Sequence, residues 1–129
     1  MALSTFEDLQ VWKRGCRQAV DIIKATDRLQ PPSLRDQVQR ASISVPSNIA
    51  EGAERDSKLD FIRFLRIAKV SNGELRTQLY IAQKLNELPA KTGNDLIKES
   101  KEISAMLQGL IRAVSRQPSP SRKRLKTEN

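Results

Sequence analysis

The stretch SVPSNIAEGAER, residues 44–55, decides the fold of this 129-residue chain. It places a proline, two serines, an asparagine and two glutamates in a segment whose other positions follow a helical pattern. From Leu34 to Gly52, apolar residues recur every three or four positions and form one stripe, while the polar residues form another. The stretch therefore predicts an amphipathic helix that is capped by Ser33 and bent at Pro46, which lacks the amide that a helix interior requires.

Three further segments have helical periodicity. The first begins at Ser4, where STFE has the spacing of a capping box, and extends to about Arg28, before a pair of prolines. The third follows a turn at residues 56–57 and extends to about Asn86. The fourth follows TGND at residues 92–95. Four helices joined by short breaks predict an all-α, antiparallel up-down four-helix bundle.

The third helix carries more apolar surface than the core of one bundle needs. One stripe is predicted to face the core: Phe61, Phe64, Ala68, Leu75, Leu79 and Ala82. A second apolar group lies on an adjoining arc: Ile67, Val70, Ile81, Leu85 and Leu88. Because a second apolar surface needs a second partner, it predicts that the bundles associate into an oligomer.

Composition narrows the class of protein. The formal net charge is +8, with the excess in the second half of the chain, which favours polyanionic partners. Cys16 is the only cysteine and there is no histidine, which excludes an internal disulfide and a Cys–His catalytic pair and favours a reducing compartment. No apolar run approaches the roughly 20 residues that span a bilayer, and the N-terminus does not have the pattern of a signal peptide. We expect a soluble, cytoplasmic protein without membrane partners.

The composition changes at Gln117. The last residues, QPSPSRKRLKTEN, are rich in proline and charge and have too little apolar surface to offset the entropy of ordering. The sequence therefore predicts a bundle domain over residues 1–116 and a basic, flexible tail over residues 117–129.

Three segments carry a resemblance to a known family: FEDLQVWKRG (6–15), RASISVPSNIAEGAERDS (40–57) and FIRFLRIAKVSNGELRTQL (61–79). In this order and spacing they resemble the bacterial four-helix bundle family named 23S rRNA intervening-sequence proteins, to which the accessory variability proteins of diversity-generating retroelements are related. The resemblance covers about residues 6–112. It implies a homopentameric ring and, from the retroelement relatives, binding to nucleic acid and to a reverse transcriptase. The family name records where some of the genes lie and does not imply a ribosomal role.

The polar stripe around Pro46 has two interpretations. A nucleophilic Ser47 needs a base and an oxyanion hole, yet the chain has no histidine, and Glu51 is spaced to pair with Arg55 instead. The favoured interpretation is architectural, in which these side chains bond neighbouring helices or subunits. We therefore expect no enzymatic activity, no cofactor and no metal. The structural motif carried over from the family comprises Pro46, Ser47, Asn48, Glu51, Gly52 and Arg55.

The third helix also carries a basic stripe within about 80° of arc. Its members are Lys58, Arg66, Lys69, Arg76, Tyr80 and Lys84. Evenly spaced cations on a rod suit a phosphate backbone, and a tyrosine among them can stack on an unpaired base. The stripe predicts nonspecific binding of RNA or DNA. Two alternatives are a solvated helix face with no ligand and a scaffold whose partner is another protein.

Overall fold

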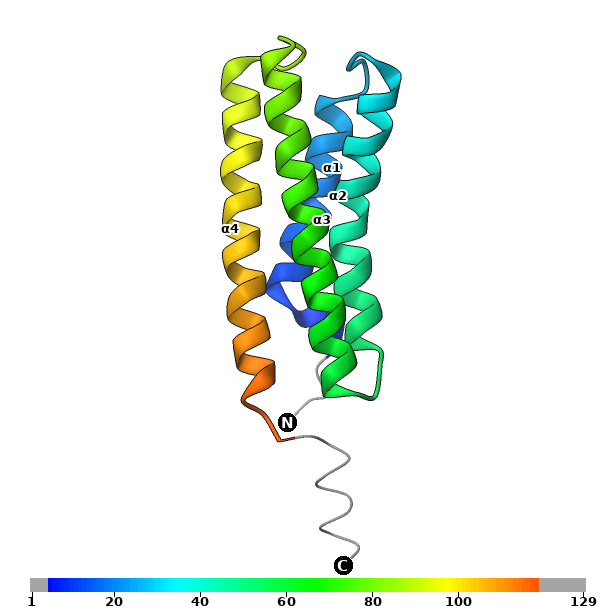
Figure 1. Cartoon of the computed structure of the whole chain (residues 1–129), viewed down its shortest axis with the longest axis vertical. Helices are drawn as coiled ribbons and strands as arrows, with labels where there is room; N and C mark the ends of the chain where they lie inside the picture. The colour runs from blue at the N-terminus through cyan, green and yellow to red at the C-terminus, as the bar shows by residue number, and fades with distance from the viewer. Residues whose placement is uncertain (1–4, 119–129) are drawn as a thin grey trace, which may run out of the picture.

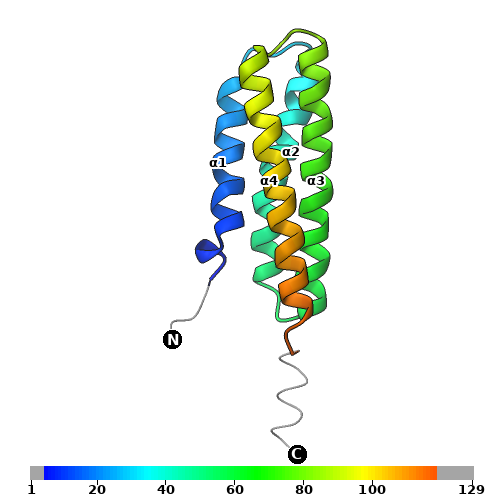
Figure 2. The ribbon, with the colours of Figure 1, turned by 90° about the vertical axis from the view of Figure 1, so that its left-hand side faces the viewer.

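The computed structural model describes residues 5–118, and within that range the chain is helical and has no strand. Four long helices run antiparallel and side by side (Figures 1 and 2). They are α1 (Gln10–Ala25), α2 (Pro32–Ala53), α3 (Lys58–Lys84) and α4 (Ala90–Ser115), and a short 3-10 helix, η1 (Phe6–Asp8), precedes α1. Each helix packs against the ones before and after it in the chain, and α1 also packs against α4. The predicted all-helical fold with four helices is confirmed.

The first helix begins later than the sequence predicts. Ser4 lies outside the described residues, and η1 is separated from α1 by Leu9, whose backbone is extended with φ −74° and ψ 123°. The long helix therefore begins only at Gln10. The break allows the ring of Phe6 to pack edge-on against Trp12, with ring centroids 5.2 Å apart and an interplanar angle of 69°.

The second helix begins at Pro32, so the prediction of Ser33 as its cap is wrong. Proline suits the first helical position because its fixed φ is already helical and its missing amide is not needed there. Pro46 is buried inside α2, which is continuous through it, and the predicted bend stays a prediction. A Cβ atom on Gly15 of α1 would lie 3.5 Å from the Pro46 ring, so the two helices are in van der Waals contact at this level.

A glycine sets the approach of α2 to α3. A Cβ atom on Gly52 would lie 2.6 Å from Cβ of Phe64 and 3.1 Å from Cδ1 of Phe61, closer than carbon atoms normally approach. Beyond the turn, the Ser57 hydroxyl caps α3 by accepting a hydrogen bond of 3.1 Å from the amide of Asp60. A glycine at the end of α2 thus allows the two helices to converge toward the turn that joins them.

The connection between α3 and α4 also differs from the prediction. The helix α4 begins at Ala90, so residues 92–95 lie inside its first turns and do not form the turn itself. The chain reverses instead at Asn86, whose φ of 58° is in the left-handed region that asparagine tolerates. Gly93 leaves room for the side chain of Gln83 on α3, because a Cβ atom there would lie 2.5 Å from Nε2 of Gln83 and would displace that side chain.

The core consists of two hydrophobic clusters with a buried polar layer between them. One cluster includes Ile22, Val38, Leu75, Leu79 and Ile97, and the other includes Val45, Ile49, Leu65, Ile103 and Leu107. The layer, at most 1% exposed, comprises Gln18, Asn72 and Ser100. The Asn72 amide accepts from Gln18 at 3.2 Å and donates to the carbonyl of Ser100 at 2.7 Å and to the hydroxyl of Ser104 at 3.0 Å.

Candidate nucleic-acid interface

The basic stripe of α3 lies along the seam where α3 packs against α4. Lys69 donates to Oε1 of Gln108 at 2.7 Å, and Arg76 donates to the hydroxyl of Ser104 at 3.1 Å. Both cations are half-buried, which restricts their side chains. Because both acceptors are neutral, these bonds position the charges without neutralising them.

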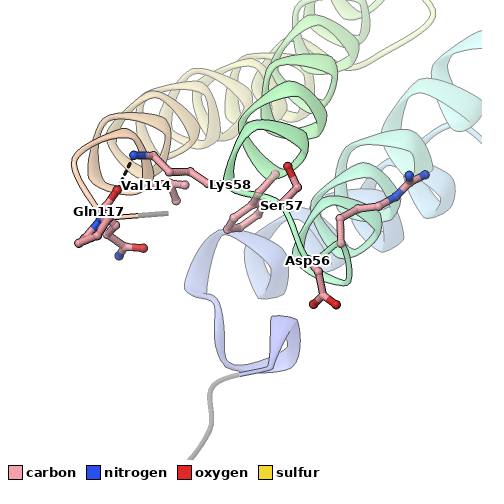
Figure 3. A pocket seen from close by; sticks show the side chains of 8 residues that line it. Asp56, Ser57, Lys58, Val114 and Gln117 are labelled. Carbon is pink, nitrogen blue, oxygen red and sulfur yellow. Dashed lines mark hydrogen bonds between the residues drawn. The ribbon is translucent and has the colours of Figure 1, made fainter. Parts of the chain in front are cut away.

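Lys58 lies at the end of the seam, in the first turn of α3. Its amino group donates to the backbone carbonyl of Gln117, just beyond α4 (Figure 3). The two residues border a cavity of about 210 Å³ that is also lined by Asp56, Ser57 and Val114. The only hydrogen bond of the Ser57 hydroxyl within residues 5–118 is the one it accepts as the cap of α3, so no base is bonded to it.

The remaining stripe residues, Arg66, Tyr80 and Lys84, are exposed, Tyr80 to 42%. Within the described range, no cation of the stripe lies within 4.0 Å of a carboxylate oxygen. The ion pairs there use other cations: Arg14, Arg17, Arg35, Arg55, Arg63 and Lys91. The positive charge of the stripe is therefore uncompensated by close carboxylates.

The fourth helix contributes cations that the sequence analysis missed. Ser104 and Gln108, which contact α3, are four residues apart, so they lie on one face of α4. Lys101 and Arg112 continue this face in the two directions, at spacings of three and four residues, and both are exposed. The spacing was present in the sequence, but only the contacts show that this face borders the stripe. Together the α3–α4 basic seam comprises Lys58, Arg66, Lys69, Arg76, Tyr80, Lys84, Lys101 and Arg112.

The polar stripe of α2 forms hydrogen bonds within the bundle. The Ser44 hydroxyl lies 2.9 Å from that of Ser71 on α3, and Asn48 donates to the Ser44 carbonyl at 2.8 Å. Glu51 and Arg55, both exposed, form an ion pair of 3.0 Å within one turn. Ser47, the serine considered as a nucleophile, is exposed and forms no side-chain hydrogen bond within residues 5–118. The partners of the Ser44 hydroxyl are a hydroxyl and an amide, neither of which is a base that would activate a serine.

An ion-pair cluster joins α1 to α4. Arg14 donates to both carboxylate oxygens of Glu99, at 2.9 and 2.5 Å, and to Glu102 at 2.7 Å. Hydrogen bonds from Arg14 lower the pKa of Glu99, whereas burial raises the pKa of the Cys16 thiol on the side of α1 that faces α2. Within residues 5–118, no three acidic or cysteine side chains gather closely enough to hold a metal ion.

Comparison with known proteins identifies the family. The sequence model of the family described as 23S rRNA-intervening sequence protein matches residues 7–109. The chain belongs to this family. A solved structure of a protein with unknown function from the S23 ribosomal protein family, from Bacteroides thetaiotaomicron VPI-5482, is similar with a TM-score of 0.74. The match has 23% identity and covers 78% of this chain and 97% of that one, which supports a shared fold. A comparison with curated proteins gives no match.

The second apolar group of α3 is exposed in this family member, with one exception. Ile67, Val70, Ile81 and Leu85 are 37–63% exposed, whereas Leu88 is only 6% exposed and packs in the core, so its predicted outward position is wrong. Leu88 follows the end of α3, so the helical arc that placed it outside does not apply there. No helix of the described residues is long and apolar enough to cross a membrane.

Proposed function

We propose that this protein is a non-enzymatic, oligomeric helical bundle that binds RNA or DNA without sequence specificity through the α3–α4 basic seam. One observation carries the proposal: the seam cations are held by neutral groups or exposed, and none is within 4.0 Å of a carboxylate in the described range. In an ordinary solvated helix face, cations alternate with carboxylates and pair with them.

The geometry of the seam suits a phosphate backbone. Lys69 and Arg76 are two helical turns apart, about 10 Å along the axis, and Lys101 and Arg112 are about 16 Å apart on the antiparallel neighbour. Cations spaced along a rod release counterions from the nucleic acid when they bind, which gives affinity with a steep dependence on salt. Tyr80, at 42% exposure, lies four residues beyond Arg76 and offers a ring on which an unpaired base stacks.

The oligomer is part of the proposal. The exposed apolar face of α3 supports self-association, and the resemblance described above implies a homopentameric ring related to the accessory proteins of retroelements. A closed ring would repeat the seam at regular intervals and convert weak contacts into avid binding. In this proposal, the protein acts in the cytoplasm and needs no cofactor.

A second candidate is a scaffold whose partner is an acidic protein. The same uncompensated charge supports it, because a carboxylate surface satisfies Lys101 and Arg112 as well as phosphates do. Competition separates the two: unlabelled RNA or DNA displaces a nucleic-acid ligand at concentrations that leave a protein partner bound.

The test is fluorescence anisotropy with labelled single-stranded RNA and duplex DNA over a series of salt concentrations. We expect Lys101→Gln/Arg112→Gln to weaken binding and to reduce the log–log salt slope by about 2, since each lost phosphate contact removes about 1. The matched control is Lys13→Gln/Lys24→Gln, which removes the same charge from exposed positions of α1. A chain ending at Pro118 retains the Gln117 carbonyl that Lys58 contacts and measures the contribution of the tail.

The outcomes distinguish the surface from net charge. If the seam variant and the control lose the same affinity and the same salt slope, binding follows net charge, and the seam is not the binding site. Absence of binding to either nucleic acid near physiological salt overturns the proposed function and favours the scaffold.

A further inference from the structure

Two unlike apolar surfaces of this chain are exposed, and we propose that they are the two halves of one interface, in which the outer face of α3 in one copy docks into the groove between α1 and α2 of the next copy. The inference rests on the oligomeric part of the proposed function and is independent of nucleic-acid binding. It names the surfaces that meet and the direction in which neighbouring bundles run.

The first surface is a ridge on α3. Its apolar members are Leu59, Ile67, Val70, Ile81 and Leu85, and the most exposed are Leu59 at 78% and Val70 at 63%. They follow one side of a helix whose opposite side is already buried in the core. Large apolar side chains at this exposure, gathered along one helix, are typical of a surface that another molecule covers.

The second surface is a groove of about 490 Å³ between α1 and α2. Its walls include Trp12, Cys16 and Val20 on one side and Ile43, Pro46 and Ala50 on the other, and Ser47 lies at its edge. Val20 and Ile43 are 49% and 48% exposed. A groove between two helices is the shape into which the ridge of a third helix packs.

Pairing the unlike surfaces covers both of them. In a two-fold contact between the α3 helices of two copies, each ridge would cover the other, and the groove would stay exposed in both copies. The two surfaces lie on different sides of α2, since the groove opens between α2 and α1 and the ridge is on α3. Each copy therefore has one of each, and docking repeats from copy to copy until a ring closes.

Charge sets the relative direction of the two bundles. Arg63 and Arg66 lie beside the ridge near Leu59, at the end of the bundle where α2 turns into α3. Arg63 also pairs with Asp60 at 3.7 Å, whereas Arg66 forms no ion pair within residues 5–118, and Glu74 lies farther along the same face. Glu54 lies at the same end, four residues after Ala50 and thus on the groove side of α2, and no ion pair of Glu54 is formed within residues 5–118. Parallel neighbours bring these opposite charges together, whereas antiparallel neighbours place them at opposite ends.

The helix contacts also fix which residues are level. On α3, Val70 precedes Ser71, whose hydroxyl is hydrogen-bonded to that of Ser44 on α2. On α1, Cys16 follows Gly15, which packs against Pro46, two residues after Ser44 on α2. Val70 and Cys16 are therefore at nearly the same height in the bundle. In a parallel arrangement, Val70 of one copy faces the groove at the level of Cys16 of the next.

The first experiment blocks each surface separately and measures molar mass by light scattering after gel filtration. We expect Val70→Glu and Ile43→Glu each to be a folded monomer by circular dichroism, because each lacks one half of every interface. An equimolar mixture is expected to form a one-to-one dimer, since the first variant has an intact groove and the second an intact ridge. Ala105→Glu, at an exposed position of α4, is the control that stays oligomeric.

The second experiment uses a short bis-maleimide cross-linker and keeps the surfaces apolar. In Val70→Cys, thiols on both surfaces are expected to give a ladder of two, three and more linked copies. The same substitution combined with Cys16→Ser is expected to give no ladder. A two-fold contact between α3 helices would instead give dimers alone, and these would persist in the double variant.

Each result has one meaning. A dimer band that persists without Cys16, an Ile43→Glu variant with the mass of wild type, or a mixture that stays monomeric overturns the pairing of ridge with groove. Wild type that is monomeric at tens of micromolar overturns both this inference and the oligomeric part of the proposed function. Neither result bears on nucleic-acid binding, which the salt series tests by itself.

Discussion

Replacing Gly52 with alanine tests the packing of α2 on α3. In most helix interiors this change stabilises a protein by up to about 1 kcal/mol, because alanine restricts the unfolded chain and favours the helix. Here the added Cβ would lie 2.6 Å from Cβ of Phe64. Carbon atoms pack at about 3.5 Å, so the helices must separate by roughly 1 Å at this level.

The clash cannot be relieved by a rotamer change, since Cβ of Phe64 is fixed to the backbone and the ring and carbonyl of Phe61 lie at 3.1 and 3.3 Å. Overpacking of a core costs about 1–3 kcal/mol, and a contact with backbone-fixed atoms belongs at the upper end. After subtracting the gain in helix propensity, we expect a net loss of about 2 kcal/mol, which lowers Tm by about 8 °C in a domain of this size.

The matched control is Gly109→Ala on α4, where a Cβ atom would meet nothing within 4 Å. It is expected to raise Tm by about 3 °C, in keeping with a gain of up to 1 kcal/mol. Thermal unfolding followed by circular dichroism at one fixed protein concentration measures both variants. If Gly52→Ala is as stable as Gly109→Ala, the close approach of the two helices is wrong.

Three further predictions follow from the buried layer, the ion pairs and the groove. Asn72→Ala removes the partner of Gln18 and is expected to lower the free energy of unfolding in urea by about 2–3 kcal/mol, more than a typical surface substitution. Because Arg14 lowers the pKa of Glu99, their ion pair stabilises the fold fully at pH values above 4.5, the ordinary pKa of a glutamate. This stabilisation is lost as the pH falls through the lowered pKa of Glu99. Tm of wild type should therefore fall more between pH 7 and pH 3 than Tm of Arg14→Gln, and equal falls would contradict the assignment. Trp12, the only tryptophan, lines the groove, so dilution that separates the copies is expected to shift its emission to longer wavelength.

The helices were predictable from the sequence because apolar periodicity is a local signal. Leu75, Leu79 and Ala82 are fully buried, as their spacing predicts. The ends of the helices were less predictable, because they depend on which neighbour a small or restricted residue meets. Ser33 has the chemistry of a cap, yet Pro32 begins the helix, and Gly93 has the chemistry of a turn, yet it serves the contact with Gln83.

The candidate site was only half predictable for a similar reason. The stripe on α3 is a property of one helix, so residue spacing alone locates it. Lys101 and Arg112 belong to the same surface only because Ser104 and Gln108 pack against α3, and this pairing between helices leaves no local signal. Which cations are held and which are exposed likewise depends on contacts across the seam.

The buried amide of Asn72 has a consequence for the outside of the molecule. Ser104 accepts one hydrogen bond from Asn72, inside the bundle, and a second from Arg76, at its surface. Any shift of α4 along α3 would therefore change the hydrogen bonds of the buried amide and of the surface guanidinium in the same movement. The position of the Arg76 charge on the surface is thus tied to the alignment of α3 and α4 in the core.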